Sequence, residues 1–266
     1  AGFYYGYRAA KYIPQDISIT AAGNPLRKVL ATAMQREGAD IYVFHHGECP
    51  GVERYPQGRR NEGSYCDYFV CPTPQITDNF RSNYSDSLLE KRVGTKYISC
   101  NSNHYKDRYR QYRSVRSSGI YKTIMLIGYG MNHTRYLDSA GYFSYFQLDV
   151  QYRVAKLIKK NGYRLIYKVH PDRSEEVGEL FTEISDDVER SPFEDVWDTA
   201  DGYVFTHPGT TVFGGAVMTD KPMLLVDLFN NNWNDSGYQL LRRRCNIVAS
   251  AYDSSNRIIF DEGEFS

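Results

Sequence analysis

The segment from Tyr163 to Leu228 decides the fold: YRLIYKVHPDRSEEVGELFTEISDDVERSPFEDVWDTADGYVFTHPGTTVFGGAVMTDKPMLLVDL. Apolar runs at 164–169, 200–206 and 221–227 alternate with polar segments whose composition suits helices. Regular alternation of strands with helices is typical of a parallel α/β sheet. Ligands of such sheets bind beyond the carboxyl ends of the strands, and the first two runs end in His-Pro sequences there. We therefore expect an α/β fold with a ligand site in this segment.

The composition of the 266-residue chain fits two Rossmann-like halves and shows no charge bias. Lys and Arg together number 32, as do Asp and Glu, so no global field favours nucleic acid or an anionic membrane as a partner. Tyrosine is abundant, with 24 residues. Its ring and hydroxyl group suit sugar and nucleotide surfaces, although an ordinary polar surface also tolerates tyrosine.

Cysteine usage and hydropathy indicate where the protein acts. The five cysteines form no C-x-x-C pair, which disfavours a disulfide scaffold or a zinc site and suits a reducing cytoplasm. The sequence shows neither a signal peptide nor an apolar run near the roughly 20 residues that span a bilayer. Because the chain opens on Ala1 within sequence that resembles folded protein, we expect a fragment. Other parts of the full protein would mediate any peripheral association with the inner face of a membrane.

The first half has the pattern of a smaller α/β domain. An Asn-Pro pair followed by apolar residues at helical spacing predicts a helix over 25–37, with Gly38 as its stop. A buried strand over 40–44 leads directly into a cluster of His, Gly and Glu residues. Further strands are expected at 66–71 and 96–100, with a short helix near 75–82 between them.

Residues 101–118 are rich in Arg, Tyr and Ser and poor in aliphatic side chains. We interpret them as the linker between an N-terminal domain at 1–115 and a C-terminal domain at 116–266. The arginines of this segment lie either on a solvated linker face or on a patch that faces phosphate or lipid; they are Arg108, Arg110, Arg113 and Arg116.

The second half opens with a strand over 123–127, followed by Gly128-Tyr129-Gly130. Small residues after the first strand of a Rossmann-like domain allow a ligand to approach the backbone, although no G-x-G-x-x-G fingerprint is present. The apolar spacing then predicts a helix that ends at Asn161-Gly162. After the segment quoted above, a helix is expected at 238–241 and a last strand at 246–249.

Two loops of the quoted segment carry groups that suit an anion. Pro171 ends strand pairing after His170, so the imidazole lies at the sheet edge and can donate to a phosphate oxygen. Alternatively, His170 caps its own loop. Gly209, Thr210 and Thr211 precede a helix, where hydroxyl and backbone N–H groups form an anion site, an ordinary helix cap, or both.

The order of these motifs is similar to that in the C-terminal half of GT-B glycosyltransferases. The chain most resembles capsule-type Kdo transferases and polysialyltransferases of bacterial surface-polysaccharide synthesis, and more distantly teichoic-acid glycerophosphotransferases. The motifs that carry the resemblance are Lys168–Asp172, Ser191–Asp195, Ala200–Asp201, His207–Thr211 and Asp220–Pro222, within about residues 120–228. The resemblance implies two Rossmann-like domains with an interdomain cleft. It also implies that His170, Thr210 and Thr211 contact the phosphate of the donor nucleotide.

Glycosyl transfer needs a base for the acceptor hydroxyl or a carboxylate nucleophile, together with stabilisation of the leaving phosphate. The nearest counterpart of the acidic residue that the resemblance implies is Glu48, although its His-Gly-Glu order departs from the acidic-acidic-Gly of the family. Asp138 is the second candidate for base or nucleophile. Histidines that could bind the donor or acceptor sugar are His45, His46 and His133. The sequence contains no Asp-x-Asp, so we expect no metal and no cofactor beyond the CMP-sugar donor.

The sequence therefore predicts a cytoplasmic, metal-independent glycosyltransferase that moves Kdo or a related ulosonic acid from a CMP donor onto a glycan or glycolipid acceptor. Residues 1–115 would form the acceptor side and residues 116–266 the nucleotide-binding side. One alternative is a UDP- or CDP-dependent transferase or epimerase of the same fold. Another is a non-catalytic module that binds nucleotides or glycans.

Overall fold

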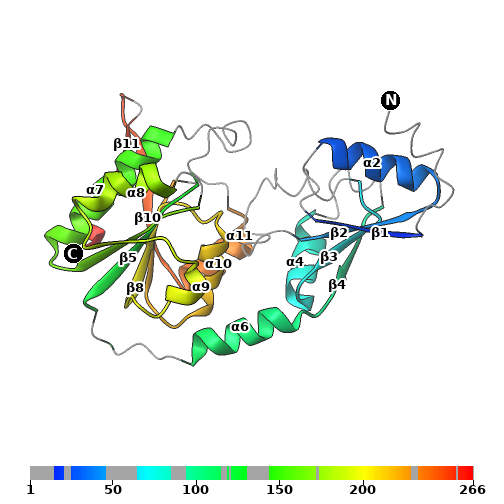
Figure 1. Cartoon of the computed structure of the whole chain (residues 1–266), viewed down its shortest axis with the longest axis horizontal. Helices are drawn as coiled ribbons and strands as arrows, with labels where there is room; N and C mark the ends of the chain where they lie inside the picture. The colour runs from blue at the N-terminus through cyan, green and yellow to red at the C-terminus, as the bar shows by residue number, and fades with distance from the viewer. Residues whose placement is uncertain are drawn as a thin grey trace. The chain divides into compact units, whose positions relative to one another are not determined.

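The computed structural model describes residues 15–20, 25–45, 65–84, 94–114, 119, 121–130, 144–171, 174–228, 233–255 and 257–265. The chain divides into two compact units, Ala1–Asp107 and Arg108–Ser266 (Figure 1). Both units are α/β, with sheets that are parallel or largely parallel. Within the described ranges, no helix is both long enough and apolar enough to cross a membrane.

The first unit is built on a parallel four-stranded sheet. Its strands lie in the order β1 (Asp16–Thr20), β2 (Asp40–Phe44), β3 (Tyr68–Cys71) and β4 (Lys96–Ser99). Helix α2 (Pro25–Arg36) connects β1 to β2, and α4 (Pro74–Tyr84) lies between β3 and β4 in the chain. Each connection therefore returns the chain to the start of a parallel neighbour, as parallel pairing requires.

Side chains alternate between the two faces along each strand, and the buried ones define the core face of this sheet. Val43, Phe69 and Tyr97 are paired across β2, β3 and β4, so their side chains share one face. They pack in one buried cluster with Ala31 of α2 and Phe80 of α4. The two helices thus supply the apolar cover that the sequence pattern of the first half implies.

The second unit contains a seven-stranded sheet in the order β11-β10-β9-β8-β5-β6-β7. The strands are β5 (Thr123–Ile127), β6 (Arg164–Lys168), β7 (Asp187–Glu189), β8 (Gly202–Phe205), β9 (Met223–Asp227), β10 (Asn246–Tyr252) and β11 (Ile258–Phe260). Only β11 runs antiparallel to its neighbour among these described pairs. Counted from β5, the first six strands take the 3-2-1-4-5-6 order of Rossmann-like folds. The strand order reverses between β5 and β8, and ligands of such sheets bind at this switch point.

Helices cover both faces of this sheet. They are α7 (Ser144–Lys160), α8 (Ser174–Thr182), α9 (Phe193–Val196), α10 (Thr211–Met218) and α11 (Asp235–Arg242), followed near the end by the 3-10 helix η2 (Glu262–Phe265). Leu126 and Val204 pack with α7 and α8 in one core cluster. The residues on either side of Val204 point to the opposite face, where Tyr203 contacts Phe193 of α9 and Phe205 contacts Phe213 of α10. Figure 1 shows α7 and α8 on one side of the sheet and α9 and α10 on the other.

Several predicted elements are confirmed, including their stops. The helix expected over 25–37 is α2, and the helix expected to end at Asn161-Gly162 is α7. Gly38 and Gly162 both have a positive φ, of 92° and 81°. The residue after each glycine donates back into the last turn, Ala39 to Met34 at 3.1 Å and Tyr163 to Ile158 at 3.3 Å. Glycine is favoured in this left-handed cap because a Cβ would be strained there.

Other predictions were wrong or incomplete. The segment interpreted as a linker forms α6 (Asn103–Arg113), and the division between the units falls inside this helix. Tyr112 of α6 is buried against Trp197 and Phe193, and Arg113 forms an ion pair with Asp220. Most other residues of α6, Arg110 and Arg113 among them, are exposed, so a solvated face describes this helix apart from the buried Tyr112. Strand β10 is not the last strand, because β11 follows it, and β1 and β7 were not predicted.

Candidate functional site

The carboxyl ends of β6, β5 and β8 bring three motifs to one edge of the sheet. His170-Pro171 follows β6, Gly128-Tyr129-Gly130 follows β5, and His207–Thr211 comes one residue after β8. The three strands are neighbours and run parallel. Because paired strands lie roughly 4.8 Å apart, the two His-Pro loops start about 10 Å from each other across β5. The structure thus brings His170 and Pro171 to the same edge as Gly209, Thr210 and Thr211.

Side-chain and backbone atoms of β6 lie close to Gly128, and they explain why glycine stands there. A Cβ at this buried position would lie 2.8 Å from the hydroxyl oxygen of Tyr167 and 3.0 Å from the backbone oxygen of Lys168. The same tyrosine is fully buried and donates to Gln151 Oε1 at 2.7 Å. Gly128 is therefore required by packing against β6. Close approach of a ligand is not what requires glycine at this position.

His207 is a tightly held polar residue at this edge. Its side chain is 7% exposed, and its ring lies 4.2 Å, centroid to centroid, from the ring of Tyr129 in the loop after β5. The Gly209 backbone N–H donates to His207 Nδ1 at 2.8 Å. A Cβ on Gly209 would lie 2.6 Å from His207 Cε1, so glycine is needed for this turn. The two loops on either side of the switch point are thus joined by a histidine and a tyrosine.

The environment of His207 fixes its protonation state. Burial lowers the pKa of His207 to about 4, so the imidazole is neutral at pH 7. Since Nδ1 accepts a hydrogen bond, the single proton lies on Nε2. His207 is therefore a neutral N–H donor that adds no positive charge to this edge.

Thr210 forms the N-cap of α10. Its Oγ1 accepts from the Phe213 backbone N–H at 3.2 Å, while its own backbone is extended. Thr211, the first residue of the helix, is exposed. Thr210 is thus an ordinary helix cap, and a capped helix start can still present N–H groups to an anion.

Removing the cap should destabilise the second unit. We expect Thr210→Ala to lower the free energy of unfolding by about 1 kcal/mol, because the Phe213 N–H loses its side-chain acceptor and keeps only the Thr210 backbone oxygen, at 3.0 Å. Thr211→Ala deletes the same hydroxyl one residue later and should change it by less than about 0.5 kcal/mol. Urea denaturation of the two variants measures the difference. Equal stabilities would contradict the assignment of Thr210 as the cap.

His170 and Pro171 lie beyond a buried strand end. His170 is half-buried and Pro171 is exposed. The preceding residues are buried, and Lys168 donates from Nζ to the backbone oxygen of Val169 at 2.9 Å. Burial lowers the pKa of Lys168, against the opposing effect of Glu189 and Glu194. His170 therefore stands where a buried strand end meets solvent.

Among the sugar-binding and catalytic candidates, the structure describes His45. It follows β2 in the first unit and is half-buried, with its ring 5.5 Å from that of Phe80 and 6.3 Å from that of Phe69. This aromatic surrounding gives it a packing role in that unit. The other candidates, Glu48, His46, His133 and Asp138, lie outside the described residues. In the described ranges, no three His, Cys, Asp or Glu side chains are grouped as metal ligands.

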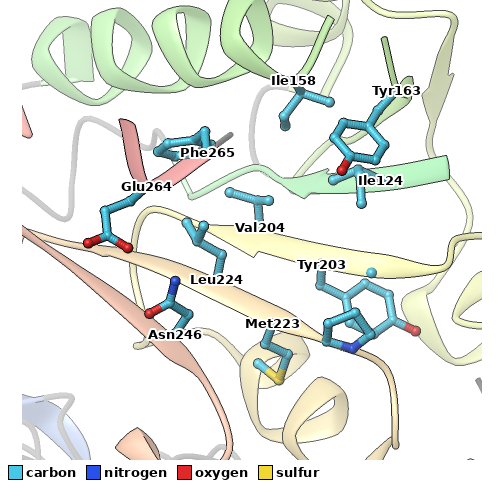
Figure 2. A pocket seen from close by; sticks show the side chains of 12 residues that line it. Ile124, Ile158, Tyr163, Tyr203, Val204, Met223, Leu224, Asn246, Glu264 and Phe265 are labelled. Atoms are coloured by element: carbon cyan, nitrogen blue, oxygen red, sulfur yellow. The ribbon is translucent and has the colours of Figure 1, made fainter. Parts of the chain in front are cut away.

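A cavity of about 260 Å³ lies at the opposite edge of the same sheet (Figure 2). Its lining includes Ile124, Met223 and Asn246, which stand near the amino ends of β5, β9 and β10. Figure 2 shows Glu264 and Phe265 closing one side of it. Its described lining residues include a carboxylate but no Lys, Arg or His, so it does not suit an anionic ligand. The cavity is thus separate from the carboxyl edge.

No protein-family model matches the chain, and no curated protein matches it significantly.

Two residues at the carboxyl edge were missed by the sequence interpretation. His207 was quoted within its motif, yet the phosphate role was given only to the residues after it. Tyr129 was regarded as part of a flexible loop. The repeat of His-Pro after two strands was an available signal for His207, whereas the contact with Tyr129 depends on β5 and β8 being neighbours.

Proposed function

We propose that this chain is a nucleotide-sugar-dependent glycosyltransferase whose second unit binds the donor. The observation that carries the proposal is the pair of His-Pro loops flanking the switch point of a sheet with Rossmann-like strand order. Open α/β sheets bind their ligands in the crevice at such a point. His170 would donate to the donor phosphate, with the start of α10 at Thr210 and Thr211 as the second phosphate contact.

The finer identity of the reaction rests on the motif resemblance. The two units would be the acceptor-side and donor-side halves of a GT-B transferase that moves Kdo or a related ulosonic acid from CMP onto a bacterial surface glycan or glycolipid. Glu48 or Asp138 would act as base or nucleophile at the acceptor hydroxyl. A nucleotide-binding module without turnover would retain the donor site but lack this step.

A thermal-shift titration tests the donor site. We expect CMP at 100 times its dissociation constant to stabilise the wild-type protein by about 2.7 kcal/mol, because it binds only the folded state. His170→Ala should lose most of this response, since one phosphate contact is removed. His104→Ala, at an exposed position of the first unit, is the matched control and should respond like the wild type.

The choice of nucleotide separates the alternatives. A response to UDP or CDP in place of CMP would favour the alternative donor. Absence of any response to CMP, UDP, CDP and GDP would overturn the proposed function. If nucleotide binds, transfer or hydrolysis of the donor by the wild type, lost in Glu48→Gln or Asp138→Asn, distinguishes an enzyme from a binding module.

A further inference from the structure

An unsatisfied amide is buried in the second unit. Gln147 in the first turn of α7 is 1% exposed. Within the described part of the chain, neither its Nε2 nor its Oε1 has a hydrogen-bond partner. Burying an amide without partners costs about 1–3 kcal/mol for each unmade bond. Such a group therefore requires an explanation.

Gln151, one turn later in α7, is a buried glutamine whose amide is hydrogen-bonded. Gln151 is fully buried on the same helix face. Its Oε1 accepts from the hydroxyl of Tyr167 at 2.7 Å, and its Nε2 donates to Thr206 Oγ1 at 3.4 Å. Both partners belong to the strand ends that form the carboxyl edge. Gln151 thus marks the level at which α7 meets that edge.

The direction of α7 places Gln147 closer to the switch point. The helix leads from β5 back to the start of β6, so its first turn lies at the carboxyl edge and its last turn at the amino edge. Ile158 near its end lines the cavity at the amino edge, in agreement with this direction (Figure 2). Gln147 precedes Gln151 by four residues, or roughly 6 Å along the helix axis. It therefore stands beyond Thr206, at the level of the loops that carry His207 and Tyr129.

We propose that the Gln147 amide binds the nucleoside portion of the donor nucleotide and is left without a partner until the ligand arrives. The ligand class follows from hydrogen-bond chemistry, because an amide offers both donors and an acceptor. A phosphate group accepts only and would leave Oε1 unpaired, whereas ribose hydroxyls and base edges both donate and accept. At the carboxyl edge of the same sheet, His207 is also a neutral donor, and the ring of Tyr129 gives a flat surface beside it. This inference rests on the proposed function, since it assumes a nucleotide at the switch point.

The test compares two identical substitutions on one helix face. Gln147→Met replaces an unpaired amide by an apolar side chain of similar size, so the ligand-free protein should melt roughly 2–4 °C higher. Gln151→Met breaks a satisfied network and should melt lower by a similar amount. In calorimetric titrations, Gln147→Met should bind CMP and cytidine at least about tenfold more weakly than the wild type, a loss of 1.4 kcal/mol. Its response to inorganic phosphate should equal that of the wild type.

The outcomes separate this inference from the function on which it rests. A lower melting temperature for Gln147→Met without ligand would show a structural amide and overturn the inference. So would a stabilised variant that binds CMP and cytidine as the wild type does. In both cases the wild-type response to CMP leaves the donor site standing. If the wild type binds no nucleotide, the proposed function fails and the nucleoside role of Gln147 fails with it. Titration with 2′-deoxy-CMP tells a ribose contact from a base contact.

Discussion

Acidification from pH 7 to pH 5 is expected to destabilise the second unit by about 2 kcal/mol through His207 alone. Burial lowers the pKa of this imidazole to about 4 in the folded protein, whereas an unperturbed histidine titrates near 6.5. Between these two values the unfolded chain binds a proton that the folded protein excludes. The stabilising contribution is therefore fully present above pH 6.5 and is lost as the pH falls towards 4. The melting temperature should drop by roughly 4–8 °C over this interval.

His207→Asn is the variant that isolates this effect. Asparagine keeps an acceptor near the position of Nδ1 for the Gly209 N–H but carries no titratable group. Its melting temperature should be nearly constant from pH 7 to pH 5. Carboxylates with a lowered pKa, such as those of Asp186 and Asp201, release their stabilisation mostly below pH 5 and so add little in this interval. Parallel pH profiles of wild type and variant would rule out His207 as the source.

Lys221→Met is expected to lower the free energy of unfolding by about 3 kcal/mol. Lys221 is 4% exposed and comes just before β9. Its ammonium group donates to the backbone oxygens of Trp197, at 2.9 Å, and of Ala200, and lies 5.2 Å from the centroid of the Trp197 ring. Methionine fills the same space but leaves these carbonyls without their charged donor. The loss exceeds the benefit of removing a buried charge, whose burial already lowers the pKa of Lys221.

Urea denaturation measures this loss, and an exposed lysine supplies the control. Lys160→Met, in the last turn of α7, makes the same chemical change at the surface and should shift stability by less than about 0.5 kcal/mol. Similar stabilities of the two variants would mean that the Lys221 contacts contribute little net free energy. Because the Lys221 ammonium lies over the Trp197 ring, its removal should also change the tryptophan fluorescence of the folded protein.

The elements that were predicted well are those whose signals are local. The strand over 123–127 and the glycine stops of α2 and α7 follow from short apolar runs and from the preference of glycine for positive φ. Helix α6 was missed because its charged and aromatic residues have little aliphatic periodicity, although a single tyrosine anchors it. Strand β7 has three residues and is defined by pairing with β6, which no local pattern reveals.

The candidate site likewise has features that follow from local sequence and features that depend on contacts between distant residues. The sequence by itself determined that two His-Pro loops follow apolar strands and that Thr210 precedes a helix, because strand ends and caps depend on neighbouring residues. Only the tertiary structure decided that these loops flank one switch point and that His207 is buried and neutral. It also decided that Gly128 packs against the Tyr167 hydroxyl, which leaves no space for a Cβ. The same is true of the difference between Gln147 and Gln151, two glutamines on one helix face. The physical reason is that strand order, burial and hydrogen-bond partners join residues far apart in the chain, and these contacts decide which polar groups are left for a ligand.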